Sequence, residues 1–178
     1  MNPQRLAAML ALRLAPGLIL MLFLLLSLSA CGGDEPAAPP PAPQAVTAEA
    51  VGHYCGMALL DHSGPKGQIF VKGRAAPVWF SSVKQVFAYT LLPEEPKGLS
   101  AIYVNDMAAT KADGAADPQS WVDARQAFYV IGSAFIGGMG AEDAMPFSDK
   151  ARALEFAQAH GGRVVTFSEV PEDYVFAQ

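Results

Sequence analysis

The stretch Pro77-Val78-Trp79-Phe80-Ser81-Ser82 indicates how this chain folds, because it leads into a helical pattern. Two aromatic residues and two serines precede that pattern, and Ser82 and Gln85 have the spacing of a capping box. Residues 144–149 repeat the arrangement 67 positions later, ahead of a second helical pattern in residues 150–160. The sequence therefore predicts two helices, each entered from a short strand or turn.

Capping signals define the ends of the two predicted helices. The first helix, residues 83–92, ends before Pro93, because the residue before a proline is disfavoured in helical conformation. Ser148 is the expected N-cap of the second helix, and the pair Gly161-Gly162 is expected to end it. The aromatic residues expected to build the core are Trp79, Phe80, Trp121 and Tyr129.

Runs of β-branched and aromatic residues, which are typical of strands, flank both predicted helices. These runs occupy residues 68–72, 101–104, 127–131 and 163–167. We therefore predict an α+β fold of two pseudo-symmetric ββαβ-type units, at about residues 51–108 and 120–170. Both units belong to one predicted domain, residues 51–178.

The first 30 residues have the features of a lipoprotein signal sequence. Arg5 and Arg13 form a basic head, an apolar core follows, and Leu28-Ser29-Ala30-Cys31 is typical of a lipoprotein processing site. The apolar run is short for a membrane-spanning helix, which needs about 20 apolar residues. We therefore expect cleavage before Cys31, lipidation of that cysteine and anchoring in a membrane. Gly32, and not aspartate, follows Cys31, which favours the outer membrane over the inner one.

Prolines and alanines alternate after Cys31, so residues 31–50 are expected to form a lipidated tether. Proline-rich segments of this kind are extended, semi-rigid spacers, and we expect no fixed structure in them. The whole chain has a formal net charge of −5, and loss of Arg5 and Arg13 with the signal sequence makes the remainder more acidic. An acidic soluble part argues against nucleic-acid binding, which needs basic patches.

Several catalytic and cofactor-binding motifs are missing from the sequence. It contains no glycine-rich phosphate loop, no dinucleotide fingerprint, no helical His-Glu-x-x-His pair and no Gly-x-Ser-x-Gly elbow. It also lacks a Cys-x-x-Cys pair, which argues against dithiol redox chemistry. After processing at Cys31, the chain would keep a single thiol, Cys55.

Cys55 lies in the pattern His53-x-Cys55-x-Met57, with Gly56 between the two sulfur-containing residues. In an extended backbone these side chains would point to the same side. Thiolate and thioether are soft ligands that select Cu(I), whereas a zinc site would need more cysteine or histidine. An unpaired thiol in an exported protein also needs an explanation, and a bound metal would protect it. The alternative is an inert, buried thiol that packs as a small hydrophobe.

Met107 and Met139 are further candidate sulfur ligands. Met107 follows Asn105-Asp106 at the end of a predicted strand, and Met139 lies in Gly137-Gly138-Met139-Gly140. Core packing is the alternative for Met107, and a flexible loop tip is the alternative for Met139. His53 is a candidate ligand whose alternative is an ordinary solvated or hydrogen-bonded role. The predicted copper site thus comprises Cys55, Met57, Met107, Met139 and His53.

From Tyr54 to about Val170 the chain resembles the NosL family, the accessory lipoproteins of nitrous oxide reductase. The resemblance rests on the lipoprotein processing site and on Tyr54-Cys55-Gly56-Met57, Gly64-Pro65-Lys66-Gly67-Gln68-Ile69, Tyr103-Val104-Asn105-Asp106-Met107, Trp121-Val122-Asp123-Ala124 and Gly138-Met139-Gly140 leading to Pro146-Phe147. It implies a periplasm-facing copper chaperone, not an enzyme, that binds one Cu(I) per chain. It further implies that the chaperone serves assembly of the copper–sulfide centre of nitrous oxide reductase, together with the Nos ABC-type transporter complex.

The resemblance also implies ligands and a fold. It assigns copper binding to Cys55 and Met57, with Met107 as a third ligand, and it implies two ββαβ-type units similar to part of organomercurial lyase. Some family members have a second cysteine, but Gly52 stands at that position here, which excludes a two-thiolate site. Two other functions stay open. One is a carbon–metal lyase or cysteine-dependent enzyme, which would need a second acid or thiol near Cys55. The other is a structural lipoprotein that docks the reductase without holding metal.

Overall fold

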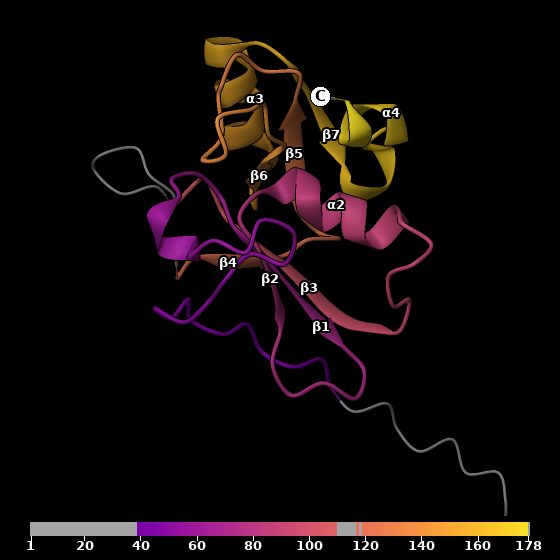
Figure 1. Cartoon of the computed structure of the whole chain (residues 1–178). Helices are drawn as coiled ribbons and strands as arrows, with labels where there is room; N and C mark the ends of the chain where they lie inside the picture. Colours follow the sequence, from indigo (N-terminus) through magenta and orange to yellow (C-terminus); the bar gives the residue numbers. More distant parts are fainter. Residues whose placement is uncertain (1–38, 110–116, 118, 178) are drawn as a thin grey trace, which may run out of the picture. The chain divides into compact units, whose positions relative to one another are not determined.

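Figure 1 shows the computed structural model of the chain, which describes residues 39–109, 117 and 119–177. The predicted signal sequence, Cys31 and the first part of the tether lie outside the described residues. Within the described ranges, no helix combines the length and the apolar character needed to cross a membrane. Residues 40–178 form one structural unit.

The first sheet of this unit has four antiparallel strands in the order β2-β1-β3-β4. Its elements are β1 (Gly67–Val71), β2 (Val78–Phe80), α2 (Val83–Leu91), β3 (Leu99–Asn105) and β4 (Trp121–Asp123). A short 3₁₀ helix, η2 (Leu59–Asp61), precedes β1. β1 lies in the interior of the sheet and is buried along its whole length, as expected for its apolar sequence. The helix α2 follows the edge strand β2 directly.

The second sheet has three antiparallel strands in the order β6-β5-β7. Its elements are β5 (Phe128–Ile131), β6 (Met145–Phe147), α3 (Lys150–His160) and β7 (Arg163–Thr166), and the chain ends with η3 (Phe167–Glu169) and α4 (Glu172–Phe176). Pro146 lies on the edge strand β6, where its missing N–H costs no ladder hydrogen bond. The predicted α+β class is confirmed, and each sheet contains the order strand, strand, helix, strand.

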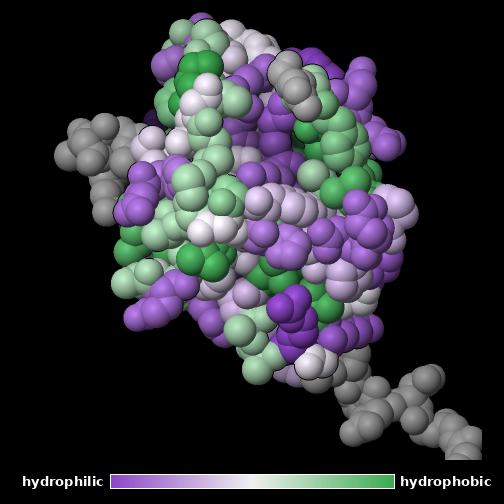
Figure 2. All heavy atoms as spheres, viewed as in Figure 1, coloured by the Kyte–Doolittle hydropathy of each residue, from purple (hydrophilic) through white to green (hydrophobic). Residues whose placement is uncertain are grey.

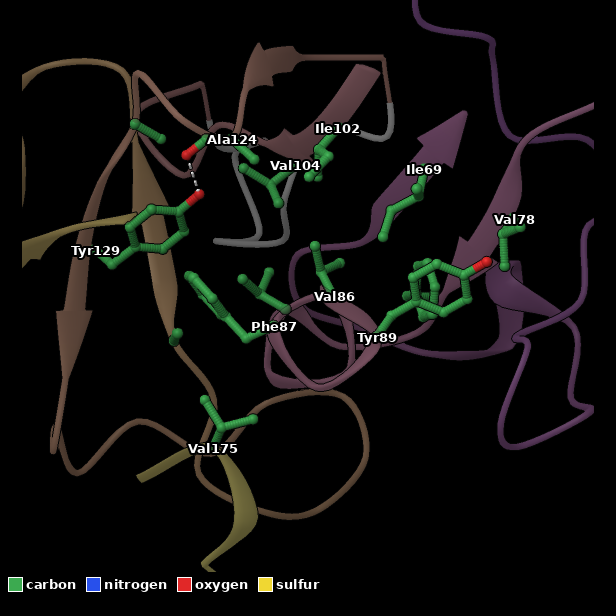
Figure 3. Packing of buried hydrophobic residues seen from close by; sticks show 14 of the residues in the cluster. Ile69, Val78, Val86, Phe87, Tyr89, Ile102, Val104, Ala124, Tyr129 and Val175 are labelled. Atoms are coloured by element: carbon green, nitrogen blue, oxygen red, sulfur yellow. Dashed lines mark hydrogen bonds between the residues drawn. The ribbon is translucent and has the colours of Figure 1, made fainter. Parts of the chain in front are cut away.

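The helix α2 contributes to a hydrophobic core that includes residues of both sheets (Figure 3). Val86 of α2 lies in the core with Ile69 of the first sheet. Phe87 extends toward Tyr129 of β5, and the two ring centroids are 5.0 Å apart. The Tyr129 hydroxyl donates to the Ala124 carbonyl oxygen at 2.6 Å, which satisfies a polar group inside the core. Because α2 contacts both sheets, its N-terminal end is held in a defined place.

The two predicted helix caps have different outcomes. Ser82 is the N-cap of α2, and its Oγ accepts from the backbone N–H of Gln85 at 3.3 Å. The predicted cap Ser148 is wrong, because Asp149 caps α3 and accepts from the N–H of Arg152 at 3.0 Å. Ser148 donates its hydroxyl to Asp106 instead. A tertiary contact 42 residues away in the sequence thus engages the side chain that local spacing suggested as the cap.

Residues 41–50 differ from the expected spacer, because they lie against the domain. The backbone of Gln44 exchanges two hydrogen bonds with the side chain of Gln68, at 2.9 and 3.0 Å. The Tyr103 hydroxyl donates to the carbonyl of Pro41 at 2.9 Å, and Val46 is buried in a cluster with Leu59. The expectation of no fixed structure is therefore wrong for this segment, whose alternating prolines leave carbonyl groups free to accept hydrogen bonds.

Candidate metal centre

Cys55 lies in a short hairpin, residues 51–58, which we call the Cys55 hairpin. Val51 and Ala58 pair as an antiparallel bridge, and the N–H of Gly52 donates to the carbonyl of Met57 at 2.9 Å. Residues 53–55 form a turn, closed by a 2.8 Å bond from the N–H of Gly56 to the carbonyl of Gly52. The expected extended backbone is therefore wrong here. Gly56 has φ +66°, a conformation that favours glycine, and it redirects the chain between Cys55 and Met57.

The Cys55 thiol is half-buried against the corner between β2 and α2. Its Sγ lies 3.3 Å from the Oγ of Ser81, and the same Oγ donates to Oε1 of Gln85 at 3.2 Å. Gly52 closes the other side, since a Cβ built there would be only 2.5 Å from the Cys55 Sγ. The thiol is free, and it keeps a defined position through contacts from both sides.

Glu95, in the loop between α2 and β3, fixes the two residues that precede Cys55. The carboxylate oxygen Oε1 lies 3.2 Å from Nε2 of His53 and accepts from the Tyr54 hydroxyl at 2.9 Å. Burial is the largest cause that raises the pKa of Tyr54 above its usual range, and the hydrogen bond to Glu95 is the second. The phenol therefore stays protonated and donates. The backbone N–H of His53 donates to the carbonyl of Trp79 at 2.8 Å, which joins the hairpin to β2.

His53 keeps one ring nitrogen for other partners while Nε2 faces Glu95. Metal-binding histidines commonly donate their second ring N–H to a carboxylate, so this contact is compatible with coordination through Nδ1. The ring also lies between aromatic side chains, 4.7 Å from that of Tyr54 and 5.5 Å from that of Tyr89. The structure therefore supports both sequence-based alternatives for His53, a hydrogen-bonded residue and an oriented candidate ligand.

Met57 lies on the same hairpin as Cys55 but faces solvent. Its side chain is 43% exposed, in contrast to the half-buried thiol. Methionine has three rotatable side-chain bonds, so an exposed thioether can change direction at little cost. The hairpin thus combines a positioned thiol with a mobile second sulfur two residues away.

Met139 lies near the same corner of the fold, on the loop before β6. It lines a cavity of about 210 Å³ together with Ser82, Gln85 and Asp143. Gln85 lines the cavity and accepts from Ser81, and Ser81 contacts Cys55, so two residues link the cavity to the thiol. The loop is held by His62, whose Nδ1 is 3.2 Å from the carbonyl oxygen of Gly138. The Met139 side chain is half-buried, unlike that of a free loop tip.

Met107 lies elsewhere. Its side chain is only 5% exposed and packs in a second hydrophobic cluster with Val130, Met145 and Phe147. It also lines a cavity of about 390 Å³ beneath α3, which Phe156 and His160 share. Core packing, the alternative from the sequence, describes this environment, and Met145 is buried in the same cluster. The structure therefore brings Cys55, Met57 and His53 onto one hairpin and places Met107 in the core of the second sheet.

Two buried charged residues hold backbone segments near the site, and neither role has a local signal in the sequence. Asp143 accepts from the backbone N–H groups of Val83 and Lys84 at 3.0 and 2.8 Å, so it caps α2 from the second half of the chain. Burial raises the pKa of Asp143 to about 6, although these hydrogen bonds by themselves lower the pKa. Lys66 donates to the carbonyls of His62, Ser63 and Gly64, at 2.6 to 3.0 Å. Burial lowers the pKa of Lys66 to about 8.

The donor set favours a soft cation. Among the described residues, no group of three or more His, Cys, Asp and Glu side chains is arranged to hold a metal ion. Zinc and the hard divalent cations are held by such groups. A thiolate with a nearby thioether suits Cu(I), for which sulfur ligands are selective. The hairpin offers this pair at the surface, where a metal ion can enter and leave.

Comparisons with known proteins agree on one family. The sequence model of the NosL family matches residues 43–175. The chain is 46% identical over 150 residues to the copper-binding lipoprotein NosL of Achromobacter cycloclastes, a match that covers 83% of this chain and 76% of the relative. It is 32% identical over 160 residues to the protein of the same name in Stutzerimonas stutzeri, with 90% and 82% covered.

A solved structure shows the same fold. The crystal structure of the copper chaperone NosL from Shewanella denitrificans superposes with a TM-score of 0.70 at 31% sequence identity. The superposition covers 75% of this chain and 98% of that structure. These relatives are named for copper binding or for a chaperone role, and not as enzymes.

Proposed function

The chain belongs to the NosL family, and we propose that it is a Cu(I) chaperone whose cargo ion is held at the Cys55 hairpin. It is a carrier and not an enzyme. The observation that carries this proposal is the placement of Cys55, a free thiol held between Ser81 and Gly52 beside an exposed methionine. The names of its relatives support copper as the cargo.

Cys55 supplies the negative charge of the proposed site, and Met57 supplies an uncharged thioether. One Cu(I) ion per chain fits a hairpin with one thiolate, because Cu(I) is satisfied by few soft ligands. Met139, on a cavity that Gln85 also lines, and His53, on the hairpin itself, are further candidate donors. Met107, the third ligand that the family resemblance implies, would have to leave its cluster to join them.

The cellular setting is also part of the proposal. We infer that Cys31 carries lipid and faces the periplasm, in the outer membrane in preference to the inner one, as the processing site predicts. The proposed destination of the copper is the copper–sulfide centre of nitrous oxide reductase, with the Nos ABC-type transporter complex as a second partner. The lipoprotein names of the relatives support the anchor, and the family resemblance supports the destination.

A competition titration with a Cu(I) chelator under anaerobic conditions tests the proposal. Cys55→Ser should lower Cu(I) affinity by more than about 100-fold, because even loss of a group that only orients a metal ligand costs 10- to 100-fold. Met145→Leu, a change in a buried methionine of the core, serves as the control and should leave the affinity unchanged. Affinity of the parent protein should also fall with acidity, since the thiolate must be deprotonated to bind. Equal affinities in Cys55→Ser and the parent protein would rule out the assigned role of Cys55.

A further inference from the structure

Large hydrophobic side chains are exposed around Cys55 in unusual number. Val51 is 51% exposed, Tyr54 42%, Met57 43% and Leu60 55%. These are four of the eight large hydrophobic side chains that are exposed in the described residues, and they fall within ten consecutive positions. Contiguous exposed apolar surface on a soluble domain commonly marks an interaction site.

This surface is preformed. The hairpin backbone is held by the Val51–Ala58 bridge and by the bond from His53 to the carbonyl of Trp79. Leu60 lies in η2, which follows directly, and the N–H of Leu59 donates to the carbonyl of Ala50 at 2.9 Å. Figure 2 shows hydrophobic surface beside η2 and below α2, interrupted by hydrophilic side chains. A partner would therefore meet apolar side chains that are already in place, which lowers the entropy cost of binding.

Acidic side chains border the same surface. Glu95 contacts both His53 and Tyr54, and the carboxylate of Glu94 is close enough to add to the rise in the pKa of Tyr54. Asp61 is exposed at the end of η2, beside Leu60. Lys97, in the same loop as Glu95, turns back and donates to the carbonyls of Thr90 and Leu92. Its charge is thus directed toward the end of α2. One basic side chain, Arg74, also lies close by, because it lines a groove with Val51 and His53, so the border is acidic on the side of Glu94, Glu95 and Asp61.

We propose that Val51, Tyr54 and Leu60 form the docking surface for the protein that receives the copper, and that this partner presents an apolar centre with a basic border. The inference rests on the proposed function, because it places the interface around the cargo site. Apolar contact excludes water from the ion during transfer, and charge complementarity orients the encounter.

Transfer across this interface is a ligand exchange without redox change. A soft ligand of the partner binds Cu(I), the bond between Cu(I) and the Cys55 sulfur breaks, and the released thiolate takes up a proton from water. Cu(I) leaves with the same oxidation state in which it was bound. Met57 is 43% exposed, so its thioether is accessible to a ligand of the partner.

The test separates copper binding from copper delivery. Each variant replaces the parent protein as the sole copy in a denitrifying host, and two quantities are measured. These are the Cu(I) affinity of the purified protein and the copper content of nitrous oxide reductase isolated from the cells. Leu60→Glu should keep the affinity and lower the copper content by about tenfold, the effect of losing one central apolar contact. Leu154→Glu, at a similarly exposed leucine of α3, should change neither quantity.

The charged border has its own pair of variants. Glu94→Lys should lower the copper content of the reductase, whereas Glu155→Lys on α3 should not. If Leu60→Glu delivers copper at the parent level, Leu60 is not part of a docking surface. The same conclusion holds if the parent protein is a dimer and Leu60→Glu is a monomer that still delivers copper at the parent level, because the surface would then serve dimer formation. Undiminished delivery by Cys55→Ser would instead show that the proposed function itself is wrong, whatever the result at Leu60.

Discussion

Met57 and Met107 are the same kind of residue in two contrasting parts of the molecule. Met57 lies on the Cys55 hairpin and is 43% exposed, whereas Met107 is buried in the cluster between β5, β6 and α3. The hairpin is held by contacts to β2 and to Glu95, yet its sulfur atoms stay near the surface. A carrier must release its ion as well as bind it, and only the first environment permits both without rearrangement of the core.

Substitution by alanine should give the largest difference between these two methionines, in its effect on the free energy of unfolding. Met107→Ala should lower the free energy of unfolding by about 2–5 kcal/mol, because it leaves a cavity in a packed cluster. Met57→Ala should change it by less than about 0.5 kcal/mol, as is usual for exposed positions. Urea denaturation followed by circular dichroism measures both. Equal losses would contradict the contrast between core and hairpin.

The pH dependence of stability tests the buried end of α2, on which the hairpin rests. The pKa of Asp143 is raised by burial to about 6, above the usual value near 4 for an unfolded chain. Between pH 4 and 6 the folded protein therefore holds a proton that the unfolded chain has released. The contribution of Asp143 to the free energy of unfolding falls as pH rises through this range, and it is constant above pH 6.

Denaturation at several pH values between 4 and 7 measures this slope by comparison of the parent protein with Asp143→Asn. The variant should lack the part of the slope that Asp143 causes. In Asp143→Asn, the N–H groups of the new side-chain amide would also face the backbone N–H groups of Val83 and Lys84. We therefore expect the variant to have a lower free energy of unfolding at pH 7. Parallel curves for the two proteins would show that Asp143 titrates at its ordinary value.

Copper affinity should depend on Met57 and not on Met107, the reverse of the order expected for stability. Met57→Leu should weaken Cu(I) binding by about tenfold, because a thioether beside Cys55 is lost. Met107→Leu preserves volume in the core and should leave the affinity close to that of the parent protein. The measurement is a chelator competition under anaerobic conditions. A larger loss in Met107→Leu would show that copper draws Met107 out of its cluster, as the family resemblance implies.

Gly52→Ala is the mildest change at the hairpin. The new Cβ would meet the Cys55 sulfur at 2.5 Å and displace it, although Gly52 itself provides no ligand. We expect a loss of Cu(I) affinity smaller than that of Met57→Leu. Gly98→Ala is the matched control, since a Cβ there lies 3.7 Å from the nearest atom, an ordinary contact. Identical affinities of these two variants would mean that the thiol position does not matter for binding.

The sequence predicted the elements of the fold well and the details of the site less well. Strand and helix positions follow from local patterns, and β1, α2, β3, β5, α3 and β7 occur within a few residues of the predicted runs. The pseudo-symmetry of the two units stays a prediction. Cys55 and Met57 were identifiable because soft metal ligands stand out in an acidic chain that has a predicted signal sequence.

The contacts that shape the site are long-range and have no local signal. Ser81 is 26 residues from Cys55 in the sequence, and Glu95 is 42 residues from His53. The turn at residues 53–55 replaced the expected extended backbone because Gly52 and Gly56 close a hydrogen bond. Nor does the sequence show that the residue after Asn105-Asp106 is buried, since burial of Met107 depends on β6 and α3, which follow about 40 residues later.

X-ray absorption at the copper edge, on protein loaded with one Cu(I) under anaerobic conditions, identifies the atoms that surround the ion. We expect a sulfur-dominated environment in the parent protein, loss of one sulfur neighbour in Cys55→Ser, and an unchanged spectrum in Met145→Leu. A spectrum of Cys55→Ser that matches the parent protein, or an environment of nitrogen and oxygen alone, would show that Cys55 does not hold the copper.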